Sequence, residues 1–269
     1  MIELAPAGSA KKSHLAFALL WLPHERRRDA MIFFRFCRAV DDIADEPGRS
    51  DEVRRVLLQE WLDGIESKRL PAELEAVVEG YRIERGLLAE IVRGCAMDIR
   101  PARFETFAEL EKYCWRVACA VGLASIRIFG CKDPASSAYA ENLGHALQLT
   151  NILRDVGEDA AAGRIYLPLA DLRRFHVSET DLLLGKPSPG FQNLMHFEAG
   201  RARARFHAAI PPAGDKGVLV APEIMKAIYF RILARLEKSG FPVFTRRIRL
   251  GRVEKLFTAV SRVIQMRFE

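Results

Sequence analysis

The sequence lacks several features that would place it in a familiar structural class. Its five cysteines are an odd number and include no C-x-x-C pair, so neither a disulfide framework nor a thiolate metal site is indicated. The longest apolar run, residues 15–22, is much shorter than the ~20 residues that a membrane-spanning helix needs. No small-residue cleavage site follows that run. We therefore expect no signal peptide and a cytoplasmic location.

Glycine and proline are also scarce, with 18 and 13 of 269 residues, which excludes a collagen-like or low-complexity chain. Apolar residues make up 49% of the chain, enough to bury one sizeable core. The length therefore predicts a single domain over residues 13–269, after a flexible N-terminus over residues 1–12. The net charge of +6 suits an anionic ligand, a membrane surface or nucleic acid. No nucleic-acid-binding module is recognisable, so we expect no such partner.

Apolar residues recur at every third or fourth position in nearly every segment, and no convincing alternation of period two is present. This periodicity predicts an all-α fold. Prolines and glycines separate the segments, but no break is long enough to be an interdomain linker. Helices are expected at residues 13–22, 24–46, 50–67, 71–84, 86–98, 106–130, 134–162, 178–184, 190–208, 216–239 and 250–267. Small residues at 117–124 would allow either close helix packing or space for a lipophilic substrate.

A first acidic cluster closes the second of these helices. Asp41 and Asp45 are four residues apart, so their carboxylates share one helix face, whereas Asp42 points about 100° away. Like charges at this spacing repel each other. The C-terminal end of a helix also disfavours anions, by about 0.3–1 kcal/mol each.

A second cluster repeats the arrangement within the long helix expected at 134–162. Asp155 and Asp159 are again four residues apart, and Asn151 lies one turn earlier on the same face. Three oxygen-bearing side chains thus share one stripe. Such hard ligands suit Mg²⁺, which combines a few carboxylates with waters and substrate phosphate oxygens.

Each cluster taken alone is also compatible with a solvated polar face. Two similar clusters, each with an arginine beside it, favour a site in which the two clusters face each other and hold cations between them. That chemistry is typical of the ionisation of a diphosphate ester, in which metal ions and arginines neutralise the leaving group and an apolar cavity protects the carbocation. Aromatic faces can stabilise such a cation. The candidates for this role are Tyr113, Tyr166, Tyr229, Phe33 and Phe36.

Four segments of the chain resemble the squalene and phytoene synthase family, and the likeness extends from about residue 13 to 265. They are residues 36–45 (FCRAVDDIAD), 113–122 (YCWRVACAVG), 148–159 (QLTNILRDVGED) and 163–168 (GRIYLP). The resemblance implies an all-α isoprenoid synthase fold, a helical bundle around one central cavity. It also implies head-to-head (1'-1) condensation of two prenyl diphosphates through a cyclopropyl diphosphate intermediate.

The resemblance also assigns roles by position. It implies Mg²⁺ as the cofactor, with Mn²⁺ as a substitute, and leaves the use of NADPH open. The implied metal ligands are Asp41, Asp45, Asn151, Asp155 and Asp159. The implied substrate contacts are Arg38, Arg154, Arg164 and Arg246 at the diphosphate and Gln148 in the cavity. Tyr113, Tyr166 and Tyr229 would face the reacting centre, with Tyr113 assisting proton removal as the cyclopropane closes.

Within the family, residues 116–130 look most like the presqualene diphosphate synthase of the bacterial hopanoid route. This likeness implies two farnesyl diphosphates as substrates, with reduction to squalene left open. A phytoene synthase or a dehydrosqualene synthase is the alternative. A head-to-tail prenyltransferase and a non-enzymatic scaffold fit the motifs less well. The implied partners are the prenyl diphosphates and downstream enzymes of a hopanoid or carotenoid route.

The basic segment 246–257 could close the diphosphate site, touch anionic lipid at a membrane periphery, or form a solvated helix face.

Overall fold

Helices form every regular element in the part of the chain that the structure, a computed structural model, describes, namely residues 2–6, 14–46, 48–186 and 188–268. The all-α prediction is thus confirmed. The helices are α1 (His14–Leu19), α2 (His24–Asp45), α3 (Asp51–Glu66), α4 (Ala72–Gly80), α5 (Arg85–Ala96), η2 (Met97–Ile99), α6 (Phe107–Cys114), η3 (Trp115–Cys119), α7 (Ala120–Phe129), α8 (Ala135–Ala161), α9 (Leu169–Arg174), α10 (Glu179–Leu183), α11 (Phe191–Ala208), η4 (Ala213–Asp215), α12 (Val220–Lys238) and α13 (Arg252–Phe268).

Local sequence signals account for many of the helix ends. Ser50 caps α3 by accepting a hydrogen bond from the backbone of Val53, and Thr106 caps α6 in the same way. Gly130 ends α7 in the left-handed conformation that glycine adopts without strain. Helix α4 ends at Gly80 rather than at 84, because the chain turns through Arg82 with a positive φ of 51°.

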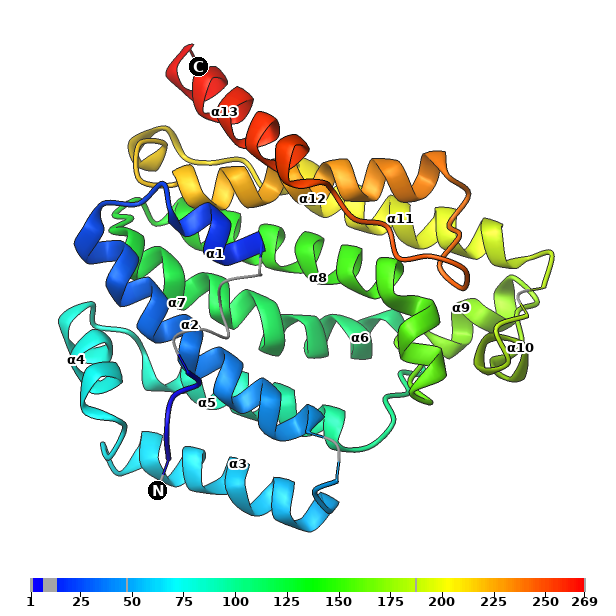
Figure 1. The fold of residues 1–269 in the computed structure, drawn as a ribbon, viewed down its shortest axis with the longest axis horizontal. Coiled ribbons are helices and arrows are strands. Elements are labelled where there is room, and N and C mark those ends of the chain that lie inside the picture. The colour runs from blue at the N-terminus through cyan, green and yellow to red at the C-terminus, as the bar shows by residue number, and fades with distance from the viewer. Residues whose placement is uncertain (1, 7–13, 47, 187, 269) are drawn as a thin grey trace.

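The long helix α8 runs through the middle of the molecule (Figure 1). Helices α11 and α12 pack on one side of α8, and α6, η3 and α7 pack on the other. Helix α2 crosses the bundle and contacts α5 and α7, while α3 and α13 lie at opposite edges. Because α2 and α8 carry the two acidic clusters, the packing of these helices in the bundle determines how close the clusters lie to each other.

The segment expected as one helix over 106–130 contains a π-helical turn at η3, between α6 and α7. This turn packs closely on its neighbours. A Cβ added at Gly144 of α8 would lie 2.8 Å from the Cα of Cys119, and one at Gly94 of α5 would meet the side chain of Val117. Small residues here thus serve close packing, while Val117, Ala118 and Gly122 also line a cavity. The stretch at 117–124 therefore packs closely on its neighbours and also borders a cavity, whereas its use by a lipophilic substrate stays a prediction.

Two further observations bear on the predicted boundaries. Of the start predicted to be flexible over 1–12, residues 2–6 are described. Ala5 is buried there, its backbone N–H donates to the carbonyl of Arg35, and Arg35 donates back to the carbonyl of Ala5. Residues 7–12 lie outside the described part of the chain.

No helix among the described residues has the length and apolar character needed to cross a bilayer.

Candidate active site

A cavity of about 850 Å³ lies between α2, α7, α8 and α12. Its wall includes nearly all of the residues that the sequence analysis singled out. These are Arg38, Asp41, Asp45, Tyr113, Gln148, Asn151, Arg154, Asp155, Asp159, Arg164, Tyr166 and Tyr229. Residues from five separate segments of the chain therefore converge on one space. The bundle thus brings together the two acidic clusters that spacing alone left unplaced.

The first acidic wall is the C-terminal end of α2. Asp41 accepts a hydrogen bond of 3.0 Å from Arg38, and Asp45 accepts one of 2.8 Å from Arg164, which follows α8 in the chain. Asp42, which points away, pairs with Arg38 at 2.7 Å and does not line the cavity. Burial, and then the negative charge of Asp45, raise the pKa of Asp41 to about 6.

The second acidic wall lies on α8. The guanidinium of Arg154 forms two hydrogen bonds with Asp155, at 2.8 and 2.6 Å, and is itself buried. Burial, and then the charge of Asp155, raise the pKa of Asp159 to about 7. The Oδ1 atom of Asn151 is buried and accepts no hydrogen bond within the described residues. An oxygen in that state is available to a ligand in the cavity.

The two acidic walls line the same cavity, and Arg164 interacts with a carboxylate of each wall. Arg164 spans them, because it leaves the end of α8 and pairs with Asp45 of α2. A further carboxylate, Asp98 of η2, contributes to the raised pKa of both Asp41 and Asp159. The repulsion that these carboxylates share is what a bound cation would relieve.

The donor atoms fit a hard divalent cation. Within the described ranges, no group of three or more His, Cys, Asp or Glu side chains is gathered closely enough to hold a metal by itself. The two walls instead offer carboxylates from two helices that line one cavity, together with the unpartnered oxygen of Asn151. Mg²⁺ suits such a site, because it retains several waters and takes its remaining ligands from substrate phosphates.

Asp98 is a site residue that the sequence analysis missed. Tyr113 and Tyr166 donate their hydroxyl hydrogen bonds to it, over 2.9 and 2.6 Å. The two tyrosine rings lie 5.4 Å apart, and Phe104 packs on both. Burial, and then the charge of Asp98, raise the pKa of both tyrosines above its ordinary value, so both phenols are neutral. Asp98 has no second carboxylate four residues away, so it does not form a pair like Asp41 and Asp45. The only signal in the sequence was its position at the end of an apolar helix.

Phe33 and Phe36, named as possible faces for a cation, are buried in the core and do not line the cavity. Arg246 does not line the cavity either. Its neighbour Arg247 lines the cavity and pairs with Asp155 at 2.8 Å and with Glu158 at 2.9 Å. The segment between α12 and α13 is not helical, so periodicity could not decide which of two adjacent arginines turns inward. Lys255 of α13 also lines the cavity.

Apolar side chains line the rest of the cavity, which follows α8 away from the carboxylates. Tyr139 lies sixteen positions before Asp155, or about 24 Å along the helix at a rise of ~1.5 Å per residue. Tyr229 of α12 lies beside Arg154 and contributes to the pKa of its guanidinium. Phe129, at the end of α7, lines the cavity as well. The cavity thus has a charged end and a long apolar end.

Sequence comparisons agree with this arrangement. A profile of the squalene/phytoene synthase family matches residues 9–254. The presqualene diphosphate synthase of Rhodopseudomonas palustris is 35% identical over 262 residues, which cover 94% of this chain and 93% of that protein. Phytoene synthase 1 of Arabidopsis thaliana is 34% identical over 259 residues, covering 88% of this chain. The chain spans about 60% of the length of that plant protein.

Solved structures show the same fold. A dehydrosqualene synthase crystallised with a ligand superimposes with a TM-score of 0.84 at 25% sequence identity, and the match covers 97% of this chain and 94% of that one. The family profile covers most of the chain, and the relatives named above are prenyltransferases. The chain therefore belongs to the squalene/phytoene synthase family and is a prenyltransferase.

Proposed function

We propose that this protein joins two farnesyl diphosphates head to head, in a Mg²⁺-dependent reaction, to give presqualene diphosphate and free diphosphate. The observation that carries the proposal is that both acidic walls line a single cavity, the rest of which is lined mainly by apolar side chains. Its volume of about 850 Å³ lies near the upper end of the ~300–1,000 Å³ range of small-molecule pockets. The similarity to the Rhodopseudomonas enzyme along nearly the whole of both chains supports the choice of substrate and product.

The metal would be held by Asp41 and Asp45 on α2 and by Asn151, Asp155 and Asp159 on α8. When bound, Mg²⁺ neutralises the charge that develops on the departing diphosphate. The unpartnered Oδ1 of Asn151 and the raised pKa of Asp41 and Asp159 support this ligand set, because each reflects a polar group that a cation would satisfy.

Three arginines of the site would change their binding partner from an aspartate carboxylate to the substrate diphosphate. In the structure Arg38, Arg164 and Arg247 each bind an aspartate of the acidic walls. With those carboxylates serving as metal ligands, the three guanidinium groups would be free to bind diphosphate oxygens, which they match in geometry. Arg154 keeps its two bonds to Asp155 and orients that carboxylate.

Tyr113 and Asp98 would act together in proton removal. As the cyclopropane closes, the carbocation loses a proton to the phenol oxygen of Tyr113. The hydroxyl proton of Tyr113 passes along its existing hydrogen bond to Asp98. Burial raises the pKa of Asp98, which makes its carboxylate a better proton acceptor than an exposed one. Tyr166, bonded to the other oxygen of Asp98, keeps the carboxylate in place.

The alternative reaction is the synthesis of phytoene or dehydrosqualene. The similarity to the Arabidopsis phytoene synthase favours it, because that protein is almost as similar in identity as the Rhodopseudomonas enzyme. The same acidic walls and tyrosines would serve both reactions. The two differ in the prenyl chain length that the apolar end accepts and in the fate of the cyclopropyl intermediate.

Purified protein should be incubated with farnesyl or geranylgeranyl diphosphate, with and without Mg²⁺ and NADPH, and the lipid products identified by mass spectrometry. The proposal predicts presqualene diphosphate from farnesyl diphosphate only when Mg²⁺ is present. Squalene in the NADPH arm would add a reductive second step. Phytoene as the sole product would overturn the substrate choice, and diphosphate release without metal would overturn the mechanism.

A further inference from the structure

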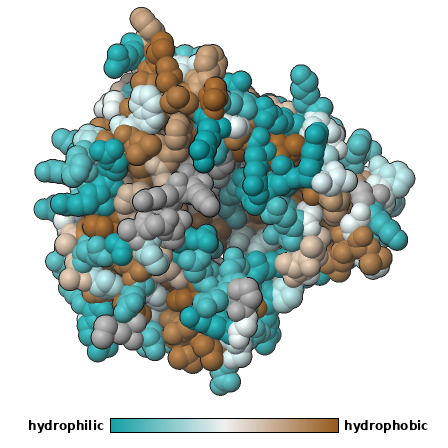
Figure 2. Space-filling model, in the orientation of Figure 1, coloured by the Kyte–Doolittle hydropathy of each residue, from teal (hydrophilic) through white to brown (hydrophobic). Residues whose placement is uncertain are grey.

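The last helix, α13, carries an apolar stripe on its outer surface. Val253, Phe257 and Phe268 are 83%, 64% and 87% exposed. At about 100° per residue, the exposed large apolar side chains of α13 fall within a band roughly 120° wide. The stripe comprises Val253, Leu256, Phe257, Val260, Ile264 and Phe268. Brown side chains gather over α13 at the top of the molecule (Figure 2).

Polar contacts anchor the opposite face of α13 together with the buried Ala259 and the adjoining Val263. Arg262 donates hydrogen bonds of 2.9 and 2.6 Å to Glu223 of α12, a carboxylate that is fully buried. Tyr139 donates to the same carboxylate at 2.7 Å. Glu254 accepts a hydrogen bond of 2.6 Å from Arg235 of α12. A surface helix normally turns its apolar face to the core. In α13 most of the large apolar side chains instead face outward, and the ion pairs of Arg262 and Glu254 hold the helix in that orientation.

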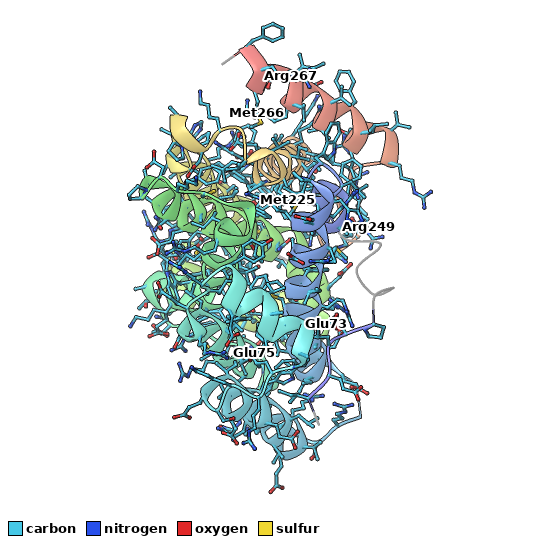
Figure 3. The ribbon with its side chains drawn as sticks, turned by 90° about the vertical axis from the view of Figure 1, so that its left-hand side faces the viewer. Glu73, Glu75, Met225, Arg249, Met266 and Arg267 are labelled. Carbon is cyan, nitrogen blue, oxygen red and sulfur yellow. The ribbon has the colours of Figure 1, made fainter. Side chains whose placement is uncertain are left out.

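The charge around the stripe has one sign. Arg252 and Arg267 are exposed at the two ends of α13, and Arg249 precedes it. In Figure 3 Arg267 lies near the outer end of the helix and Arg249 lies below its base. The one acidic residue in α13, Glu254, is occupied on the inner face. The outer face therefore presents bulky apolar side chains flanked by cations.

We propose that the outer face of α13 docks on the surface of an anionic lipid bilayer, with its apolar stripe in the interfacial region and Arg252 and Arg267 at the headgroups. Apolar side chains on one face combined with flanking arginines are the features of an interfacial amphipathic helix. A second copy of the chain fits less well. Antiparallel pairing of two stripes would bring Arg252 of one helix near Arg267 of the other, and those like charges repel.

Docking in this way would bring the bilayer near the part of the cavity wall that adjoins α13. Arg249 and Leu250, just before α13, line the cavity, as does Lys255 on its first turns. A prenyl substrate or product could then pass between bilayer and cavity with little exposure to water. This consequence rests on the proposed function, whereas binding to the bilayer does not.

The test is co-sedimentation of the full chain with vesicles, without substrate, so that its outcome is independent of the reaction. One set of vesicles is phosphatidylcholine, and the other also contains phosphatidylglycerol. Wild-type protein should bind the anionic vesicles and be released by salt. The double variant Phe257→Glu/Ile264→Glu should lose on the order of tenfold or more in vesicle partitioning. Arg252→Gln/Arg267→Gln should reduce the preference for phosphatidylglycerol.

Val56→Glu is the matched control, because Val56 is 55% exposed on α3, at the opposite edge of the molecule. It should leave vesicle binding unchanged. The Phe257/Ile264 variant should also turn over detergent-dispersed substrate at the wild-type rate, which shows that it folds. Failure of the wild-type protein to bind either vesicle would overturn the proposal. So would a wild-type dimer that the Phe257/Ile264 variant dissociates, since the stripe would then serve a second copy.

Discussion

The hydroxyl of Tyr113 donates a hydrogen bond of 2.9 Å to one carboxylate oxygen of Asp98, while Tyr166 donates to the other oxygen at 2.6 Å. Two neutral phenols thus share a single, partly buried acceptor that interacts electrostatically with both acidic walls. The arrangement couples the group proposed to remove a proton to a carboxylate that can take it.

Asp98→Asn removes the negative charge and leaves only one acceptor oxygen for two hydroxyl groups. We expect kcat to fall by about 10²-fold or more, with a much smaller change in KM, because proton transfer is impaired while diphosphate binding is retained. Tyr81→Phe is the control, since Tyr81 also donates to an aspartate, Asp29, but lies outside the cavity. Equal kcat values for Asp98→Asn and wild type would remove Asp98 from the mechanism.

The metal-free protein should become less stable as the pH rises. The pKa of Asp41 is raised to about 6 and that of Asp159 to about 7, above the ordinary 3.8 of an aspartate. The folded state therefore binds more protons than the unfolded state, and that stabilisation is lost as the pH rises through the folded pKa values. Tm measured in chelator should fall between about pH 4 and pH 7, and Asp159→Asn should flatten the slope.

Mg²⁺ should reverse this trend, because protons and the metal compete for the same carboxylates. The increase in Tm on adding Mg²⁺ with inorganic diphosphate should be larger at about pH 8 than at about pH 5. A pH-independent increase would argue against binding at Asp41 and Asp159.

Gly157 lies between the two aspartates of the second wall, where the segment after α12 presses on α8. A Cβ at this position would overlap the carbonyl oxygen of Val243 and lie 2.8 Å from its carbon. Gly157→Ala should therefore displace the segment that carries Arg247, raise KM, and lower the free energy of unfolding by about 1–3 kcal/mol. Gly200→Ala on α11, where an added Cβ meets no atom within 4 Å, should instead stabilise by roughly 0.4–1 kcal/mol. Chemical denaturation and steady-state kinetics measure both effects.

Phe129 offers a test of chain-length selection. It lies at the end of α7 and lines the apolar part of the cavity, sixteen positions from Tyr113. Phe129→Ala should extend the cavity and shift the ratio of kcat/KM for farnesyl and geranylgeranyl diphosphate about tenfold or more toward the longer substrate. Phe191→Ala is the control, because Phe191 is equally buried but does not line the cavity. An unchanged ratio in Phe129→Ala would show that other residues limit the chain.

The helices that carry the acidic walls could be predicted from local signals. The range 24–46 became α2 (His24–Asp45), and 134–162 became α8 (Ala135–Ala161), because prolines and glycines mark their ends. Helix α9 was not predicted, since its six residues after Pro168 are too few to show helical periodicity. The π-helical turn of η3 depends on packing against Gly94 and Gly144 of other helices, which no local pattern encodes.

The site was predictable where it repeats a spacing and where it resembles a known family. Asp41 and Asp45, or Asp155 and Asp159, are visible as pairs because helical geometry puts them on one face. Asp98 was missed because its partners, Tyr113 and Tyr166, lie 15 and 68 positions away in the chain. The choice between Arg246 and Arg247 depends on the path of a non-helical segment, which only the structure reveals.

The central claim is that the two acidic walls bind Mg²⁺ and diphosphate together. The most direct measurement of this claim is the rate of Mg²⁺-dependent diphosphate release in three matched variants. Asp41→Asn and Asp155→Asn each remove one carboxylate from a wall, whereas Asp42→Asn removes a carboxylate from the same turn of α2 outside the cavity. We predict a loss of about 10³-fold for Asp41→Asn and for Asp155→Asn, with intact folding, and a rate near wild type for Asp42→Asn. Turnover by Asp41→Asn or Asp155→Asn within about threefold of the wild-type rate would contradict the account.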